Sequence, residues 1–164
     1  MIVRAEMVID RPCDEVFALV ADRLFETYHL WNTGVIEIEQ LTEGPVRVGS
    51  RGVALTYIRR GRSGYHEEGC TFEVVHYLEG RELGLDESDP HPMIDRSRMM
   101  VLFDPLGART RLRAAEQIFW GVDWTAFAQP FLWLRRKADL RRNLRRLRAA
   151  LQAKALPPPP RRPR

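Results

Sequence analysis

Apolar and polar residues alternate in many segments between residues 2 and 120, and glycine or proline separates these segments. In residues 2–9 every odd position is apolar, from Val3 to Ile9, which is the period of a strand with one buried face. Similar patterns predict further strands at 35–41, 53–59, 65–77, 96–104 and 109–120, with a short strand around Leu83 and Leu85. The stretch from Asp86 to Pro92 is rich in acidic residues and proline, so we expect a loop there.

Two short helices and one long helix complete the pattern. Asp10 followed by Pro12 is a helix-start signal, and we expect a second short helix at about residues 22–29. After Asp123, a suitable N-cap, apolar residues recur at three- and four-residue spacing, which predicts a long amphipathic helix. Pro130 lies inside this segment and should kink or restart the helix.

The order of these elements predicts an α+β fold. Consecutive antiparallel strands would form a curved sheet wrapped around the long C-terminal helix, with the two short helices near the N-terminus. A sheet that grips one helix leaves a space between them, and such spaces are ordinary sites for small ligands. We expect one ligand-binding domain over residues 1–154 and a disordered Pro/Arg-rich tail over residues 155–164.

Composition restricts the function classes. The chain has 45% hydrophobic and 29% charged residues, and no apolar run long enough to span a bilayer. The N-terminus lacks the order of a secretory signal, and Cys13 and Cys70 are too few for a disulfide framework, so we expect a cytoplasmic protein. No metal-ligand spacing, glycine-rich nucleotide loop or nucleophile elbow is present, and we expect neither a metal nor another cofactor.

Charge is distributed unevenly along the chain. Residues 1–134 contain 14 Lys/Arg and 21 Asp/Glu, whereas residues 135–164 contain 12 Lys/Arg and a single acidic residue, Asp139. The basic end is either a solvated helix face, which could also dock on the acidic body, or a surface that contacts anionic membrane lipid. Nucleic acid is a less favoured partner, because the basic segment lacks interleaved aromatic residues.

Several motifs resemble one known superfamily. They are IDRPCDEVFALVAD at residues 9–22, Trp31 with the apolar positions after it, GPVRVGSR at residues 44–51, and the long C-terminal helix. Over residues 2–152 the chain is similar to START-like (SRPBCC) proteins, in the polyketide cyclase/dehydrase and lipid-transport group. The resemblance implies a helix-grip fold around a hydrophobic small-molecule ligand. It implies no catalytic set, because these motifs specify a helix start, a packed tryptophan and a turn.

Alternation brings a few polar residues onto apolar strand faces. The candidates for acid–base chemistry are Tyr57, His66, Glu68 and Glu116. A buried carboxylate such as Glu116 must be paired, hydrogen-bonded or neutral. Glu116 is therefore either half of a salt bridge with Arg98 or Arg113, or a general acid or base whose pKa is raised by desolvation. His66 is either exposed at the start of its strand or directed inward, where it would move protons near neutral pH.

Large side chains are candidates to line the cavity, although the same residue types also form ordinary cores. Tyr57 is placed on the cavity side of its strand together with Val53 and Leu55. The proposed ligand-binding set is Trp31, Tyr57, Phe72, Arg98, Met100, Trp120, Trp124, Phe127 and Phe131.

These features leave three hypotheses for function. The first is a module that binds a lipid-like or polyaromatic small molecule, which needs no catalytic residue. The second is a polyketide aromatase, cyclase or dehydratase, in which a shaped cavity folds a poly-ketone chain and positioned groups move protons. The third is a membrane-associated accessory protein that uses the basic helix. Two or more titratable groups that converge in the pocket would favour the enzyme, and a dry pocket would favour the carrier.

Overall fold

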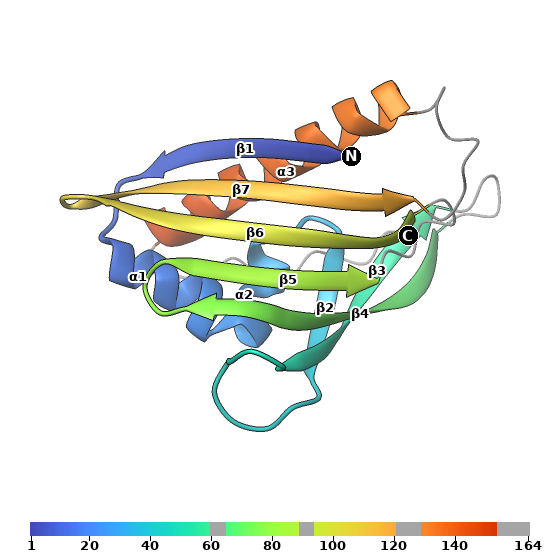
Figure 1. Ribbon diagram of the computed structural model, residues 1–164, viewed down its shortest axis with the longest axis horizontal. Helices are drawn as coiled ribbons and strands as arrows, with labels where there is room; N and C mark the ends of the chain where they lie inside the picture. The colour runs from blue at the N-terminus through green and yellow to red at the C-terminus, as the bar shows by residue number, and fades with distance from the viewer. Residues whose placement is uncertain (60–64, 89–93, 121–128, 154–164) are drawn as a thin grey trace.

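The computed structural model describes residues 1–59, 65–88, 94–120 and 129–153. Their elements follow the predicted order, with one π-helical turn, η1, between the two short helices (Figure 1). In chain order they are β1 (Ile2–Ile9), α1 (Cys13–Phe17), η1 (Ala18–Asp22), α2 (Leu24–Trp31), β2 (Val35–Gln40), β3 (Arg51–Arg59), β4 (Tyr65–Leu78), β5 (Glu82–Ser88), β6 (Ile94–Leu106), β7 (Arg109–Trp120) and α3 (Gln129–Gln152).

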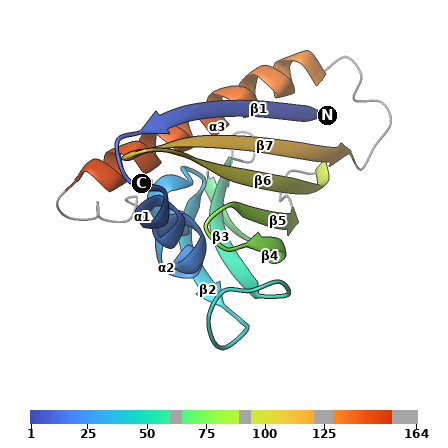
Figure 2. The same cartoon turned by 60° about the vertical axis from the view of Figure 1, so that its left-hand side comes forward.

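The strands form one antiparallel sheet of seven strands in the order β1-β7-β6-β5-β4-β3-β2. Consecutive strands pair with one another, except that β1 joins β7 at the far edge. Bulges interrupt the pairing between Val35 and Glu37, Val74 and His76, and Ile94 and Arg96, and bulges bend a sheet. In Figures 1 and 2, β2 and β3 are turned steeply relative to β1, β7 and β6. The sheet is therefore strongly curved.

The long helix α3 lies across the concave face of this sheet, and α2 packs at its side (Figure 2). Leu140, Leu144 and Leu147 recur at four- and three-residue spacing and are at most 5% exposed. They meet the inner rows of the strands, where Val101, Leu112 and others are buried. This arrangement confirms the predicted helix-grip architecture, and the amphipathic stripe of α3 supplies the contact.

Two predictions about the strands are wrong. Val53 and Leu55 are partly exposed, whereas Ala54 and Thr56, between and after them, are buried. The outer row of β3 is itself apolar, so hydrophobicity alone selected the wrong face. In addition, the acidic stretch that begins at Asp86 continues β5 to Ser88 rather than forming a loop, because these residues pair with Arg96 to Arg98 of β6.

Three predicted features lie outside the described residues: the helix start at Asp123, the rest of the predicted loop after Ser88, and the tail over residues 155–164. Pro130 is the second residue of the described part of α3, and the segment before it, where a kink or restart would show, lies outside the described residues. None of the helices in the described ranges is both long enough and apolar enough to cross a membrane.

We expect His29 to make the folded state sensitive to acid. It lies half-buried on α2, and burial, together with the nearby Arg146 guanidinium, lowers its pKa. The unfolded chain then binds this proton more readily than the folded chain, so protonation favours unfolding. The free energy of unfolding should fall as the pH drops below about 6.5. In urea titrations at several pH values, H29Q should flatten this part of the profile, and an unchanged profile would contradict the expectation.

Candidate functional site

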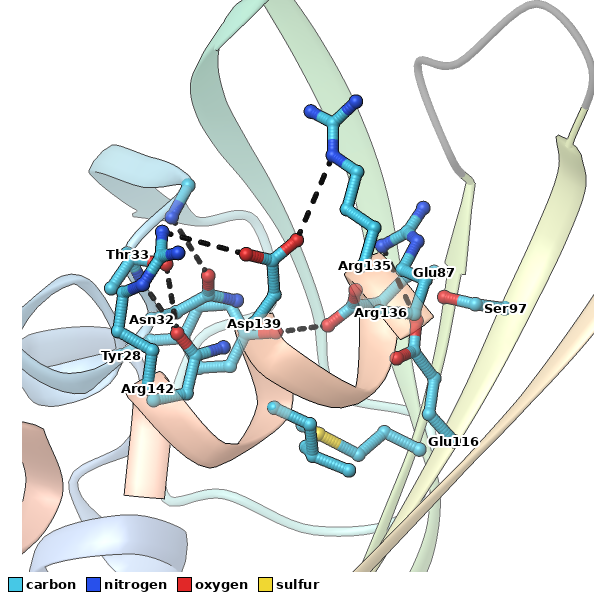
Figure 3. A pocket seen from close by; sticks show the side chains of 14 residues that line it. Tyr28, Asn32, Thr33, Glu87, Ser97, Glu116, Arg135, Arg136, Asp139 and Arg142 are labelled. Atoms are coloured by element: carbon cyan, nitrogen blue, oxygen red, sulfur yellow. Dashed lines mark hydrogen bonds and ion pairs between the residues drawn. The ribbon is translucent and has the colours of Figure 1, made fainter. Parts of the chain in front are cut away.

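A pocket of about 270 Å³ lies between α3 and the sheet (Figure 3). One wall comes from α3, a second from the end of α2 and the residues after it, and the floor from β5, β6 and β7. Met99 and Leu140 supply apolar surface, while Tyr28, Glu87 and Glu116 supply titratable groups. Tyr28 is the only aromatic residue in the described part of this lining, so the described wall is of mixed polarity.

Glu116 of β7 projects from the sheet toward α3, where it meets Arg136 (Figure 3). The guanidinium nitrogen lies 3.3 Å from the carboxylate oxygen. The arginine side chain is 27% exposed and the glutamate side chain 12%. The alternation that placed Glu116 on the inner face with Ala114 and Ile118 is confirmed by their burial. Glu116 thus presents a carboxylate, held by a cation from the helix, to the interior of the pocket.

Arg98 and Arg113, the partners expected for Glu116, lie on the outer face of the sheet. Arg98 binds both carboxylate oxygens of Asp86, and this hydrogen bonding lowers the pKa of Asp86. Arg113 binds Asp104 in the same bidentate manner. The salt-bridge alternative for Glu116 is therefore right in kind and wrong in partner, because the cation comes from α3 and not from a neighbouring strand.

Tyr28 of α2 and Glu87 of β5 form a second pair inside the pocket (Figure 3). The Tyr28 hydroxyl donates a hydrogen bond to Glu87 Oε1, and the tyrosine is 2% exposed. Burial, followed by the negative charge of Glu87, raises the pKa of Tyr28 well above its usual value. The phenol therefore keeps its proton at neutral pH and directs it at a carboxylate.

The rim of the pocket is polar and tied together by α3. Asn143 Oδ1 accepts hydrogen bonds from the Thr33 amide at 3.0 Å and the Thr33 hydroxyl at 2.9 Å. Asp139 lies 3.4 Å from Arg142 and 4.0 Å from Arg135 (Figure 3). The two hydrogen bonds to Asn143 hold the turn after α2 against α3, whereas the Asp139 ion pairs lie within the helix, so that the same helix supplies both the wall and the rim.

The aromatic residues predicted to bind ligand have different positions. Trp31 is 4% exposed, its indole nitrogen has no partner among the described residues, and its ring packs edge-on against Tyr28 at 4.7 Å. Phe72 is also buried and stacks on Phe25 at 5.4 Å. Trp120 lies on the inner face of β7 with its indole nitrogen buried. None of these three lines the pocket under α3, although Trp31 and Phe72 both pack against Tyr28, which does.

Three other predicted ligand contacts are on the wrong side of their elements. Arg98 and Met100 alternate with the buried Ser97 and Met99, and so they lie on the outer face of β6. Phe131 is 77% exposed on the solvent side of α3. On β6 the buried row begins with a small polar residue, Ser97. The larger, apolar Met100 was therefore predicted to face the cavity in place of its neighbour Met99.

The remaining candidates are only partly described. Glu68 lies half-buried on β4, opposite Thr56 of β3, whose hydroxyl donates to the Glu68 carbonyl. The side chains of Tyr57 and His66, and the whole of Trp124 and Phe127, lie outside the described residues. Among the residues that the structure does describe, no group of three His, Cys, Asp or Glu could hold a metal ion.

The pocket contains residues that sequence reasoning missed, chiefly Tyr28, Glu87, Ser97 and Arg136. Glu87 carried a weak signal, since it follows Leu83 and Leu85 at the two-residue period of a strand. Arg136 carried none, because one arginine among the many of the basic helix differs from the others only in its place on the helix.

Comparison with solved structures shows the same fold. A START superfamily protein from Mycobacterium smegmatis is 13% identical, with a TM-score of 0.71 over 92% of this chain and 97% of that chain. A protein from Thermus thermophilus is 16% identical, with a TM-score of 0.65 over 93% and 97%. The di-domain ARO/CYC BexL from the BE-7585A biosynthetic pathway is 16% identical, with a TM-score of 0.67 over 93% of this chain and 46% of that chain.

Sequence comparison gives a family but no individual relative. No curated protein matches the chain. The family model described as polyketide cyclase / dehydrase and lipid transport matches residues 1–152. Because this match covers nearly the whole sequence and agrees with the fold, the chain belongs to the polyketide cyclase/dehydrase and lipid transport family of START-like (SRPBCC) proteins.

Proposed function

We propose that the chain binds a largely apolar small molecule carrying ketone or hydroxyl oxygens, in the pocket between α3 and the sheet. The observation that supports this most directly is the composition of the pocket wall. Met99 and Leu140 offer apolar contact, and the Arg136 guanidinium offers N–H donors to oxygen atoms. The family description, which joins polyketide enzymes with lipid transport, supports the same ligand class.

The size of the pocket narrows the proposal. Ligand pockets for drug-sized molecules measure about 300–1,000 Å³, and the volume under α3 is about 270 Å³. A compact molecule of one or two rings suits this space, whereas a lipid with two long acyl chains does not. We therefore place the ligand among small cyclic or folded polyketide-like compounds.

A second candidate function is cyclase or dehydratase activity on such a compound. It is favoured by the two carboxylates, Glu87 and Glu116, which converge on one pocket and are each held by a donor. In this reaction Glu116 removes a proton from a carbon next to a ketone, and Arg136 stabilises the enolate oxygen. The enolate carbon then attacks a second ketone of the same molecule and forms a carbon–carbon bond. Glu116 returns its proton to the new alkoxide, and loss of water gives the enone.

A linear diketone with three methylenes between its carbonyls tests the second candidate, because its intramolecular condensation gives a cyclic enone with a new ultraviolet absorbance. We expect the wild-type chain to accelerate this reaction and E116Q to reduce the rate by about 100-fold or more, the usual contribution of a positioned general base. Glutamine keeps the shape of the side chain and removes its basicity. E6Q is the matched control, since Glu6 is exposed on the opposite face of the sheet.

Calorimetric titration with an acetylnaphthol, a two-ring hydroxyketone, tests the first candidate. We expect saturable binding of one molecule per chain, and only a small change in E116Q. If the chain binds the acetylnaphthol but does not accelerate condensation of the diketone, the binding function stands and the cyclase or dehydratase function is contradicted. If neither the acetylnaphthol nor any compound extracted from the purified protein is bound in a one-to-one ratio, the binding proposal itself is wrong.

A further inference from the structure

The helix α3 presents a strongly basic face to solvent on the side opposite its buried leucines. Five arginines, here called the arginine face, are exposed along it: Arg135, Arg141, Arg142, Arg145 and Arg148. Their spacing keeps them on the solvent side of the helix, over a length of about 20 Å. We propose that the arginine face is a docking surface for an anionic lipid bilayer, and that docking brings the rim of the pocket to the membrane.

Few carboxylates compensate this charge. Asp139 is the only acidic residue in α3, which contains eight Lys and Arg. It lies near Arg135 and Arg142, whereas Arg141, Arg145 and Arg148 pair with no carboxylate in the described part of the chain. Within the described ranges, the ion pair that joins a basic residue of α3 to a carboxylate of the sheet is the one between the inward-facing Arg136 and Glu116.

Two large apolar side chains stand on the same side of α3. Phe131 is 77% exposed and Leu134 is 59% exposed. Helical geometry places both in line with Arg135 and with the small, exposed Ala138. An aromatic and an aliphatic residue beside a row of cations is the composition of a helix that lies in a membrane interface. The apolar pair would enter the headgroup and acyl boundary while the arginines meet lipid phosphates.

The remainder of the chain favours one orientation. Residues 1–128 contain 14 Lys/Arg and 21 Asp/Glu, so an anionic surface repels the body and attracts α3. The pattern fits a bilayer better than a nucleic acid, because the apolar side chains gather at one end of the helix and are not interleaved with the cations as stacking platforms. Charge and apolar exposure thus select the same partner.

The docking surface and the pocket share residues. Arg135 and Arg142 belong to the arginine face and also line the pocket under α3 (Figure 3). A chain docked through this face holds the pocket rim among the lipid headgroups. A membrane-dissolved ligand would then enter or leave with little passage through water, and this last step rests on the proposed binding function.

Co-sedimentation of the full chain with vesicles tests this inference, and it requires no pocket ligand. The probes are vesicles of phosphatidylcholine alone and of phosphatidylcholine with phosphatidylglycerol in a two-to-one ratio, at physiological ionic strength. We expect binding to the anionic vesicles only. The triple variant R141Q/R145Q/R148Q should weaken it by on the order of fivefold per arginine. F131S/L134S should weaken it at unchanged net charge.

The matched control is R4Q/R109Q/R111Q, which removes the same charge from exposed positions elsewhere in the molecule. If this control loses as much binding as the triple variant on α3, the attraction depends on net charge alone and the docking surface is wrong. Absence of wild-type binding to anionic vesicles would overturn the proposal, as would binding to duplex DNA through the same arginines with no vesicle binding. Far-ultraviolet circular dichroism of each variant separates loss of binding from loss of fold.

Discussion

Replacement of Leu147 by alanine is expected to lower the free energy of unfolding by about 2–5 kcal/mol. Leu147 is 1% exposed and lies in the buried stripe with which α3 grips the sheet. Truncation removes apolar contact and leaves a cavity that the surrounding strands can fill only in part. The effect should appear as a lower urea midpoint without a change in the slope of the transition.

A second leucine of the same helix provides the control. Leu134 is 59% exposed, so L134A removes the same atoms from a position that contributes little burial, and surface changes of this kind usually stay within about 0.5 kcal/mol. If L147A and L134A shift the midpoint equally, the described packing of α3 on the sheet is incorrect.

Replacement of Gly52 by alanine is expected to lower the free energy of unfolding by about 1–3 kcal/mol or more, through overpacking. A methyl carbon on Gly52 would lie 2.6 Å from Phe25 Cε1 and 2.7 Å from Phe72 Cζ. It would also lie 2.8 Å from the backbone carbonyl of Glu39. The two rings are stacked on each other at 5.4 Å, so neither can move away without disturbing α2 or β4. Thermal and urea unfolding both measure the loss.

Gly69 offers the matched control for this substitution, because it too lies within a strand of the same sheet. Among the described side chains, a methyl carbon on Gly69 would meet only Val53 Cγ1, at 3.5 Å, which is ordinary van der Waals contact. G69A should be neutral or slightly stabilising, since alanine restricts the unfolded chain more than glycine does. Equal destabilisation by G52A and G69A would show that the cost comes from the backbone and not from the close approach of the rings.

Alternation predicted the strands well because one face of the sheet is covered and the other is not. In β7 the buried row runs from Thr110 through Leu112 to Ile118, and the period alone placed Glu116 among them. The same reasoning failed in β3, where the outer row is also apolar. The alternation also shifts at the bulge in β4, beyond which His76 is exposed and the partly buried Tyr77 packs against Phe17. A bulge of one residue leaves no signal in the hydrophobic pattern.

The candidate site was harder to predict because its contacts join distant parts of the chain. Tyr28 and Glu87 are 59 residues apart, and Glu116 and Arg136 are joined only when α3 closes on the sheet. Periodicity predicts which face of its element a residue occupies. It does not predict which residue of another element lies opposite. Glu116 could therefore be identified as a buried carboxylate, while its partner required the tertiary structure.

The pairing of the first strand with the last also affects how the chain is made. Ile2 lies opposite Gln117, and the Met1 amine donates to the Ile118 carbonyl at 2.9 Å. Contacts of such high sequence separation form late and slow folding, because a long loop must close first. On the ribosome, β1 is synthesised before the other six strands of the sheet and its partner β7 after them, so β1 has no native strand to pair with until the whole sheet has been translated. Refolding of this protein should accordingly be limited by closure of the β1–β7 edge.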